Sequence, residues 1–230
     1  RAAVFDEESK GMKYEWQPIP EADAARCREL RDAMIEACAD VSDAIMEKFI
    51  GGDTATVTEE EIWAALRKGG LEFKFVPVLC GSAFKNKGVQ LLLDAVVNLL
   101  PSPLDIPPVE GIHPEKKEKD GTPKKEVRKA SDSEPFSALA FKMMNDPHGS
   151  LTFFRVYSGT ITSGQAVMNT TRGKRERIGR ILRMHANKRE EIDVCYAGNI
   201  YAAVGMRDTR TGDTLCEDKH PILLEKMEFP

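Results

Sequence analysis

A short run of small residues is the first place where this sequence could approach a ligand. Gly81-Ser82-Ala83 follows an apolar run from Phe73 to Cys80. If that run is a strand of an open α/β sheet, the turn lies at its carboxyl end, where such sheets bind ligands. Three small residues are a weak signal by themselves, and a tight turn without a ligand is the alternative interpretation.

No other segment has the spacing of a nucleotide or catalytic site. The phosphate-loop pattern G-x-x-x-x-G-K-[ST] is absent, and the Asn-Lys pairs at Asn86 and Asn187 lack the aspartate of N-K-x-D. No serine or cysteine lies beside an evident base. The histidines are too scattered for a metal site; they are His113, His148, His185 and His220. Residue chemistry alone therefore predicts a non-enzymatic binding module without catalytic residues or metal ligands.

Five basic residues around a turn at Gly173 form the densest positive cluster of the chain: Arg172, Lys174, Arg175, Arg177 and Arg180. Arginine and lysine on an exposed hairpin suit contacts with nucleic-acid phosphates. Glu176 interrupts the cluster, so a merely solvated hairpin stays open as the alternative.

Six acidic residues recur at spacings of three and four in the region of a predicted helix: Glu29, Asp32, Glu36, Asp40, Asp43 and Glu47. On one continuous helix they would share an arc of roughly 80°. Like charges at these spacings each cost a few tenths of a kcal/mol, so stability does not explain the stripe. A solvated face is one interpretation, and a docking surface for a basic partner is the other.

Composition fits a globular chain with two modest cores. The chain has 230 residues, 41% hydrophobic and 30% charged, and a net charge of −4, which argues against a dedicated DNA binder. Its five cysteines form neither a disulfide framework nor a zinc motif, so we expect reduced thiols in the cytoplasm. No apolar run is long enough to span a bilayer. Arg1 at the start and apolar sequence at the end suggest an internal piece of a longer protein.

The first hundred residues have the pattern of helices around a small α/β element. Apolar spacing predicts one long helix over 21–49, with Leu30, Met34 and Val41 on its buried face. Thr58 and Glu61 form a capping box, which predicts a second helix from Glu59 to about Lys68. We further expect a short strand over 14–16, a buried strand over 73–80 and a helix over 89–100.

Prolines between Pro101 and Pro108 mark a domain boundary. Beyond them, short alternating segments predict an antiparallel β-barrel. A charged stretch over 113–129, around Asp120-Gly121, predicts an exposed hairpin or loop. The expected strands are 136–141, 151–157, 165–171, 177–184 and 198–204.

Two long segments resemble the elongation factor G family of translational GTPases. Residues 81–108, GSAFKNKGVQLLLDAVVNLLPSPLDIPP, are similar to the end of its GTPase domain. Residues 149–191, GSLTFFRVYSGTITSGQAVMNTTRGKRERIGRILRMHANKREE, are similar to its domain II, as are TGDTLC and the closing MEFP. The resemblance covers nearly the whole chain in the same order.

The resemblance implies a fold of the multidomain α+β type. Residues 1–104 would be the carboxyl part of the GTPase domain, with an inserted helical subdomain over about 1–72, and residues 105–230 the domain II barrel. Ser82 and Ala83 would contact guanine in the intact factor, which binds GTP or GDP with Mg²⁺. The remaining nucleotide motifs would precede Arg1, so this chain alone should bind no nucleotide.

The resemblance also implies the ribosome as partner of a monomeric protein. Domain II would meet ribosomal RNA and protein of the small subunit, and the acidic stripe would meet the stalk protein of the large subunit. A paralogous translational GTPase, such as a release or ribosome-protection factor, is one alternative. A non-enzymatic RNA-binding barrel is the other.

Overall fold

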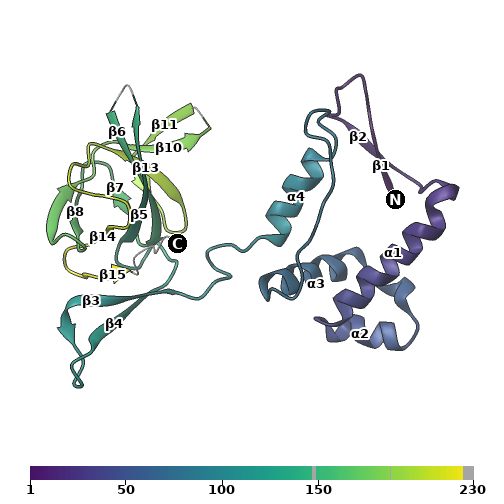
Figure 1. Cartoon of the computed structure of the whole chain (residues 1–230), viewed down its shortest axis with the longest axis horizontal. Helices are drawn as coiled ribbons and strands as arrows, with labels where there is room; N and C mark the ends of the chain where they lie inside the picture. Colours follow the sequence, from purple (N-terminus) through teal and green to yellow (C-terminus); the bar gives the residue numbers. More distant parts are fainter. Residues whose placement is uncertain (147–148, 187, 225–230) are drawn as a thin grey trace. The chain divides into compact units, whose positions relative to one another are not determined.

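The structure, a computed structural model, describes residues 1–146, 149–186 and 188–224, and it divides into two units, Arg1–Pro101 and Ser102–Pro230 (Figure 1). The first unit is mainly helical and the second is built of β-strands. No helix in the described part of the chain is long and apolar enough to cross a membrane.

The helical unit begins with an antiparallel hairpin and continues through four α-helices. Its elements are β1 (Ala2–Phe5), β2 (Tyr14–Gln17), α1 (Glu21–Ala39), α2 (Asp43–Ile50), the 3₁₀ turn η1 (Thr54–Thr56), α3 (Glu59–Leu71) and α4 (Val89–Leu99). The core of the unit lies among α1, α2 and α3, and its buried residues are Ile35, Cys38, Ala39, Val41, Ile45, Val57, Ile62 and Ala65. The predicted strand over 14–16 and helix over 89–100 are confirmed as β2 and α4.

The single long helix predicted over 21–49 is wrong, because the chain turns between α1 and α2. The Val41 and Ser42 amides donate to Cys38 and Ala39, three residues back, and Ser42 is extended. In a straight helix Ile35 and Ile45 would lie about 15 Å apart. The turn instead brings them into one core cluster, where both are fully buried.

The apolar face of α1 also differs from the prediction. Leu30 is 57% exposed, whereas Ile35 and Cys38 are buried. The apolar spacing runs along the whole of α1, but only the carboxyl-terminal part of this helix is packed. The amino-terminal half buries no side chain. Periodicity therefore located the helix but not the part of it that packs.

Helix α3 starts at the predicted capping box. The Glu61 amide donates to Thr58 Oγ1 at 3.2 Å, and the Thr58 amide donates to Glu61 Oε2 at 2.8 Å. The helix then continues past its expected end at Lys68, through Gly69, to Leu71. A Cβ on Gly69 would stand 2.3 Å from the Phe75 ring, so this glycine lets the ring pack against the helix backbone.

The buried strand predicted over 73–80 is also wrong. This segment has no regular structure, and Phe73 is 91% and Val78 is 90% exposed. A strand needs a neighbour to satisfy its backbone amides and carbonyls, and no described strand pairs with this segment. The apolar surface exposed in this part of the chain continues on α4, where Leu93 and Val97 are exposed as well.

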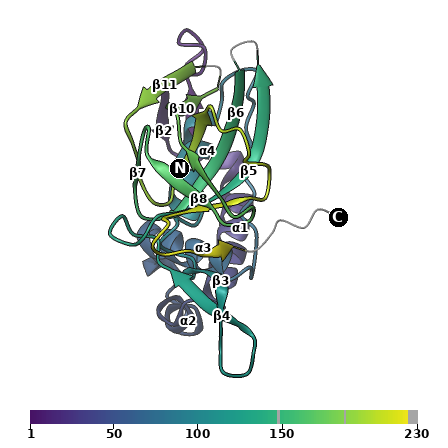
Figure 2. The same cartoon turned by 90° about the vertical axis from the view of Figure 1, so that its left-hand side faces the viewer.

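The β unit is one large antiparallel sheet with two smaller ones. The eight-stranded sheet has the order β11-β10-β13-β6-β5-β14-β8-β9, and β7 pairs with β12 separately (Figures 1 and 2). The strands of these two sheets are β5 (Ser137–Asp146), β6 (Gly149–Ser158), β7 (Ile161–Thr162), β8 (Ala166–Asn169), β9 (Lys174–Arg177), β10 (Ile181–His185), β11 (Lys188–Ile192), β12 (Val194–Cys195), β13 (Ile200–Val204) and β14 (Thr214–Cys216).

The antiparallel β architecture is confirmed, but strand pairing does not close it into the predicted barrel. In the described residues the sheet has two ends, β11 and β9, which do not pair with each other. Both end strands are rich in charged residues, and charged edge strands resist further pairing. The sheet still encloses a core; its largest fully buried side chains include Phe154, Ile181, Tyr201 and Leu215.

One predicted strand of this unit is divided, and the predicted charged hairpin is present. The strand predicted over 177–184 is two strands, β9 and β10, because the chain breaks at Ile178–Arg180, where Gly179 lies directly against the Val204 carbonyl. The charged stretch around Asp120-Gly121 is confirmed as a hairpin, β3 (Val109–Lys117) and β4 (Pro123–Arg128), which β15 (Leu223–Leu224) extends. Figures 1 and 2 both show this hairpin projecting from the larger sheet.

Candidate nucleic-acid interface

The predicted basic cluster lies on the hairpin of β8 and β9. The two strands pair from Ala166 with Arg177 to Asn169 with Lys174, and the chain reverses through a turn that ends at Gly173. Gly173 has φ +64, a left-handed conformation that glycine adopts without strain. The side chains of Arg172, Lys174 and Arg175 are therefore held near the tip of the hairpin, and all three residues are exposed.

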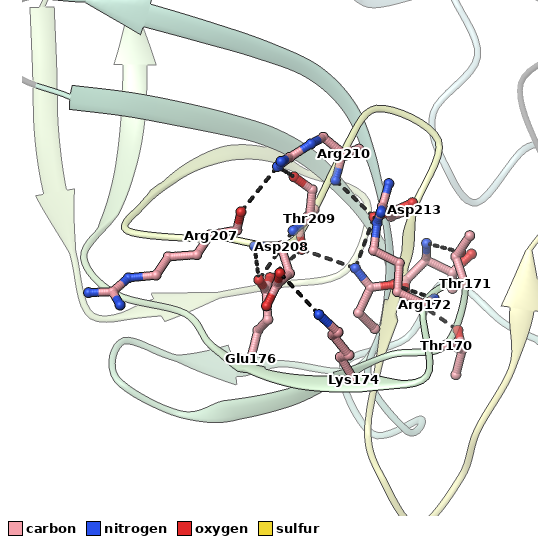
Figure 3. A network of polar contacts seen from close by, with 12 residues as sticks. Thr170, Thr171, Arg172, Lys174, Glu176, Arg207, Asp208, Thr209, Arg210 and Asp213 are labelled. Carbon is pink, nitrogen blue, oxygen red and sulfur yellow. Dashed lines mark hydrogen bonds and ion pairs between the residues drawn. The ribbon is translucent and has the colours of Figure 1, made fainter.

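A buried polar network anchors this hairpin to the loop between β13 and β14 (Figure 3). Asp213 is 3% exposed. Its Oδ2 accepts from Asn169 Nδ2 at 3.0 Å, from Arg172 Nε at 2.6 Å and from the Arg210 amide at 2.8 Å. Asn169 also donates to Thr209 Oγ1 and accepts from the Arg172 amide at 3.1 Å. A buried carboxylate is tolerated when it is hydrogen-bonded in this way.

Arg172 thus has a structural task that the other basic residues lack. Its side chain is 42% exposed, but the Asp213 side chain to which it donates is only 4% exposed. Removal of Arg172 would leave Asp213 with one charged partner fewer in a buried place. The positive charge of Arg172 is consequently partly neutralised inside the protein.

Glu176, which interrupts the basic cluster, holds the same loop from the other side. Its carboxylate accepts hydrogen bonds from the Asp208 amide, from the Thr209 amide at 3.2 Å and from the Thr209 hydroxyl. The acidic residue in this hairpin therefore serves the fold, and its presence is no argument against an anion-binding surface beside it.

The other predicted basic residues have weaker partners at the surface. Lys174 lies 3.3 Å from Asp208, Arg175 pairs with Asp218, and Arg180 lies 3.8 Å from Glu191. Arg177 donates to the Gly164 carbonyl. Exposed ion pairs contribute about 0–1 kcal/mol each, so an incoming phosphate can replace these partners at little cost.

The anchored loop brings two arginines near the hairpin that sequence reasoning missed. Figure 3 shows Arg207 and Arg210 on this loop, and both are exposed. Arg210 also donates from Nη1 to the carbonyls of Arg207 and Thr209. One residue of the sequence could have indicated that another segment packs against this hairpin. Asn169 lies on the same, buried face of its strand as Val167, and a buried polar side chain requires hydrogen-bond partners. We name as the basic surface the exposed residues near the hairpin tip and on the anchored loop, Arg172, Lys174, Arg175, Arg207 and Arg210. Arg177 and Arg180 of the predicted cluster are exposed too, but they lie at the far end of β9 and beyond it.

Ser82 and Ala83 lie in a tight turn of the helical unit. The Ser82 amide donates to the Lys87 carbonyl at 2.8 Å, and the Lys87 amide donates back to Ser82 at 3.0 Å. Ala83 is exposed, and no acceptor for its amide lies within the described residues. The Ala83 amide therefore has no partner among the described residues, which is compatible with a ligand contact and with a plain turn.

The six acidic residues are all exposed, but they are not one stripe. Glu29, Asp32 and Glu36 lie on α1, Asp40 caps its end, and Asp43 and Glu47 lie on α2. The turn at Ser42 changes the helix direction, so the shared arc expected from a continuous helix does not exist. What remains is a set of acidic side chains on two helices.

Two of the four histidines have local partners in the described residues. His113 is buried, and its Nδ1 accepts from the Lys116 amide at 3.0 Å; His220 lies 3.2 Å from Glu217. His148 and Asn187 fall outside the described residues, as does the closing MEFP. Among the described residues no group of three or more His, Cys, Asp or Glu side chains is arranged to hold a metal ion.

Comparisons with known proteins identify the type of this β segment. The family model for elongation factor Tu domain 2 matches residues 149–216. A crystal structure of a protein from Thermus thermophilus is similar in fold, with a TM-score of 0.68 at 19% identity over 95% of this chain and 30% of that one. The chain thus spans less than a third of that protein. The basic hairpin and its buried network lie inside the matched residues, which form a segment of the elongation factor Tu domain 2 type and support a translational-GTPase domain II in this part of the chain.

Proposed function

We propose that this chain is a portion of a translational GTPase of the elongation factor G type and that it supplies ribosome-binding surfaces. The observation that carries the proposal is the match of residues 149–216 to elongation factor Tu domain 2, on a sheet that presents an anchored basic hairpin. In the proposed division, residues 105–230 are domain II. Residues 1–104 are the carboxyl part of the GTPase domain, with an insertion over about 1–72.

The basic surface is proposed to contact phosphates of small-subunit ribosomal RNA. Phosphate contacts release counterions, so binding should weaken steeply with salt. Lys174 and Arg175 suit this role best, because each pairs only with an exposed carboxylate, whereas Arg172 also stabilises buried Asp213.

Sedimentation of the chain with ribosomal subunits across a salt series tests this proposal. The variant Lys174→Ala/Arg175→Ala should bind more weakly, and its log affinity against log salt should flatten by about one unit per lost contact. The matched control is Lys116→Ala/Lys117→Ala, which removes the same charge from exposed positions on the projecting hairpin of the same unit. Equal loss in both variants would show a general charge effect and rule out a local contact.

Ser82 and Ala83 are proposed to meet guanine in the intact factor, where GTP or GDP and Mg²⁺ would be held mainly by other parts. The chain itself should not bind nucleotide usefully. A hydrogen bond contributes about 1 kcal/mol net, far from the roughly 8 kcal/mol of a micromolar affinity. Calorimetry with GDP and GTP checks this, and micromolar binding would contradict it.

The acidic residues on α1 and α2 are proposed to meet the stalk protein of the large subunit. Because the stripe is broken at Ser42, we assign its two parts separate tests. Charge reversal of Glu29, Asp32 and Glu36 on α1 is compared with reversal of Asp43 and Glu47 on α2, in the intact factor. Stopped-flow association with ribosomes at low salt should slow for the part that guides encounter; unchanged rates for both would leave them as solvated faces.

A further inference from the structure

Two turns of the helical unit that lie far apart in the sequence are in contact (Figure 1). One is the reversal between β1 and β2, residues 6–13, which we call the hairpin turn. The other, residues 82–87, lies just before α4 and holds the residues proposed to meet guanine; we call it the Ser82 turn. All three helices of the unit's core, α1 to α3, lie between the two turns in the sequence.

The hairpin turn touches the Ser82 turn backbone to backbone. Gly11 is buried and has φ +76, a conformation that glycine adopts without strain. A Cβ on Gly11 would stand 2.6 Å from the Lys85 carbonyl oxygen and 2.8 Å from that of Asn86. No side chain fits between the two turns at this point, so a larger residue at position 11 must push them apart.

Gln90, the second residue of α4, ties the two turns together from the side. Its Nε2 donates to the Met12 carbonyl at 3.0 Å and to the Gly11 carbonyl at 3.4 Å. Both neighbours are acceptors, so the amide must present its NH₂ group to them. The Gln90 Oε1 atom is buried and has no partner among the described residues. The side chain is therefore used as a donor only.

The Ser82 turn needs such outside support. Its own closure consists of the Ser82 amide donating to the Lys87 carbonyl at 2.8 Å and the Lys87 amide donating to Ser82 at 3.0 Å. Asn86 has φ +53, which residues other than glycine seldom adopt. The segment 73–80 ahead of the turn pairs with no described strand, so no sheet holds it. An exposed ion pair of Lys87 with Glu7 at 3.6 Å adds little.

We propose that the hairpin turn positions the Ser82 turn and that Gln90 is the positioning residue that joins them. Neither element touches a ligand; each holds the backbone that would. A binding site is only as precise as the groups that support it. The consequence for nucleotide rests on the function proposed above: if Ser82 and Ala83 meet guanine in the intact factor, loosening the hairpin turn shortens the time that nucleotide stays bound.

A pair of glycines tests the backbone contact. Gly11 and Gly52 both have φ +76, but nothing lies within 4 Å of a Cβ built on Gly52. Gly11→Ala and Gly52→Ala thus carry the same backbone cost, and only the first meets a neighbour. Amide hydrogen exchange of the ¹⁵N-labelled chain is followed by NMR. In Gly11→Ala the Ser82 and Lys87 amides should exchange about fivefold faster or more, and in Gly52→Ala as in the parent.

Three substitutions test the side chain. Gln90→Glu keeps the size but places a carboxylate against two carbonyls, and it should speed exchange at the Ser82 turn by a similar factor. Gln90→Lys keeps a donor and removes the unsatisfied oxygen, so it should restore the rates of the parent. The control is Gln17→Glu, the same change of charge at an exposed position of β2. The Ile62 amide, which donates to Thr58 at 3.2 Å in α3, reports any general loss of stability.

The consequence for nucleotide is measured separately, in the intact factor. Stopped-flow release of a fluorescent GDP analogue should be about fivefold faster or more in Gly11→Ala and Gln90→Glu. It should be unchanged in the two controls and in Gln90→Lys. If Gly11→Ala does not fold, the Gln90 series carries both measurements.

Faster exchange together with faster release supports the positioning and the guanine contact. Faster exchange with unchanged release supports the positioning and contradicts the guanine contact. If only Gly11→Ala changes the exchange, the role assigned to Gln90 is overturned. Parent-like exchange at Ser82 and Lys87 in both variants overturns the positioning, whatever the release rates are, and so does an equal rise at Ile62.

Discussion

The two units of this chain differ in what covers their apolar residues. In the β unit every long strand has neighbours within the sheet, and Phe154 and Tyr201 are almost fully buried. In the helical unit the core is confined to α1, α2 and α3, while Phe73, Val78 and Val97 stay exposed. The same kind of apolar pattern is therefore core in one unit and surface in the other.

The difference extends to polar groups. In the β unit a buried carboxylate, Asp213, accepts side-chain hydrogen bonds from residues 41 and 44 positions away in the sequence. In the helical unit the capping box of α3 and the ion pairs lie at or near the surface; one example is Lys48 with Glu61 at 2.7 Å. Buried networks fix a loop in one conformation, whereas surface pairs contribute little. We expect the β unit to keep its site rigid and the helical unit to respond more readily to its surroundings.

The largest contrast should appear in thiol reactivity. Burial raises the pKa of the Cys195 thiol from 9.0 to about 12, while Cys80 is exposed. A rise of about three pKa units lowers the reactive thiolate fraction roughly a thousandfold, before any steric protection. With iodoacetamide at pH 8, followed by peptide mass spectrometry, Cys80 should be modified quickly and Cys195 should not. Comparable rates at both cysteines would show that the β core opens as easily as the exposed segment.

Next in size is the loss of the buried network. Asp213→Ala leaves Arg172, the buried Asn169 amide and the Arg210 backbone amide without their shared acceptor. Since the remaining cation, Arg172, is partly exposed, the expected cost is that of unsatisfied buried donors, about 1–3 kcal/mol. The control, Asp208→Ala, removes an acid from the exposed pair with Lys174 and should cost within about 1 kcal/mol. Urea unfolding followed by circular dichroism measures both. Equal effects would mean that the network adds nothing beyond a surface ion pair.

A smaller effect is expected at the start of α3. Thr58→Ala removes one half of the capping box, which should lower the stability of the helical unit by about 1 kcal/mol.

The hydrogen bonds from Lys48 and then from the Thr58 amide hold the pKa of Glu61 below its usual value. Their contribution is therefore present above the ordinary carboxyl pKa and is lost as pH falls through the lowered one. Helix content followed against urea at pH 7 and at acidic pH checks both statements; the β-unit transition should not respond to Thr58→Ala.

Local sequence signals predicted those elements that depend on local chemistry. Thr58 with Glu61 gave the start of α3, and Asp120-Gly121 gave the β3–β4 hairpin, because caps and turns are made by residues close in sequence. The alternation along β6 was equally clear, since Phe154, Val156 and Ser158 are buried in turn with half-buried residues between them. Strand β13 differs, because three consecutive residues of it are buried.

Burial itself was not predictable, because it depends on segments far away in the chain. The run 73–80 has the composition of a buried strand and lacks a partner in the described structure. The apolar spacing continues across the break at Ser42, because α1 and α2 both pack on one core. The break did have a local signal, since a serine followed by Asp43 is typical of a helix start. The network of Asn169, Asp213 and Glu176 needed contacts between segments distant in the sequence. The basic cluster itself was visible, but its anchoring was not.

The smallest expected effect concerns Phe73, an exposed apolar residue of the helical unit. Phe73 is 91% exposed, so Phe73→Ser removes little buried surface and should change the free energy of unfolding by no more than about 0.5 kcal/mol. The same substitution at fully buried Phe154 opens a cavity in the β core and introduces a hydroxyl there, which should cost about 3–5 kcal/mol. Binding of a dye for exposed apolar surface should fall in Phe73→Ser and rise in Phe154→Ser. If Phe73→Ser instead destabilises the helical unit by more than about 1 kcal/mol, segment 73–80 is packed in solution. The two units would then not differ in how their apolar residues are covered.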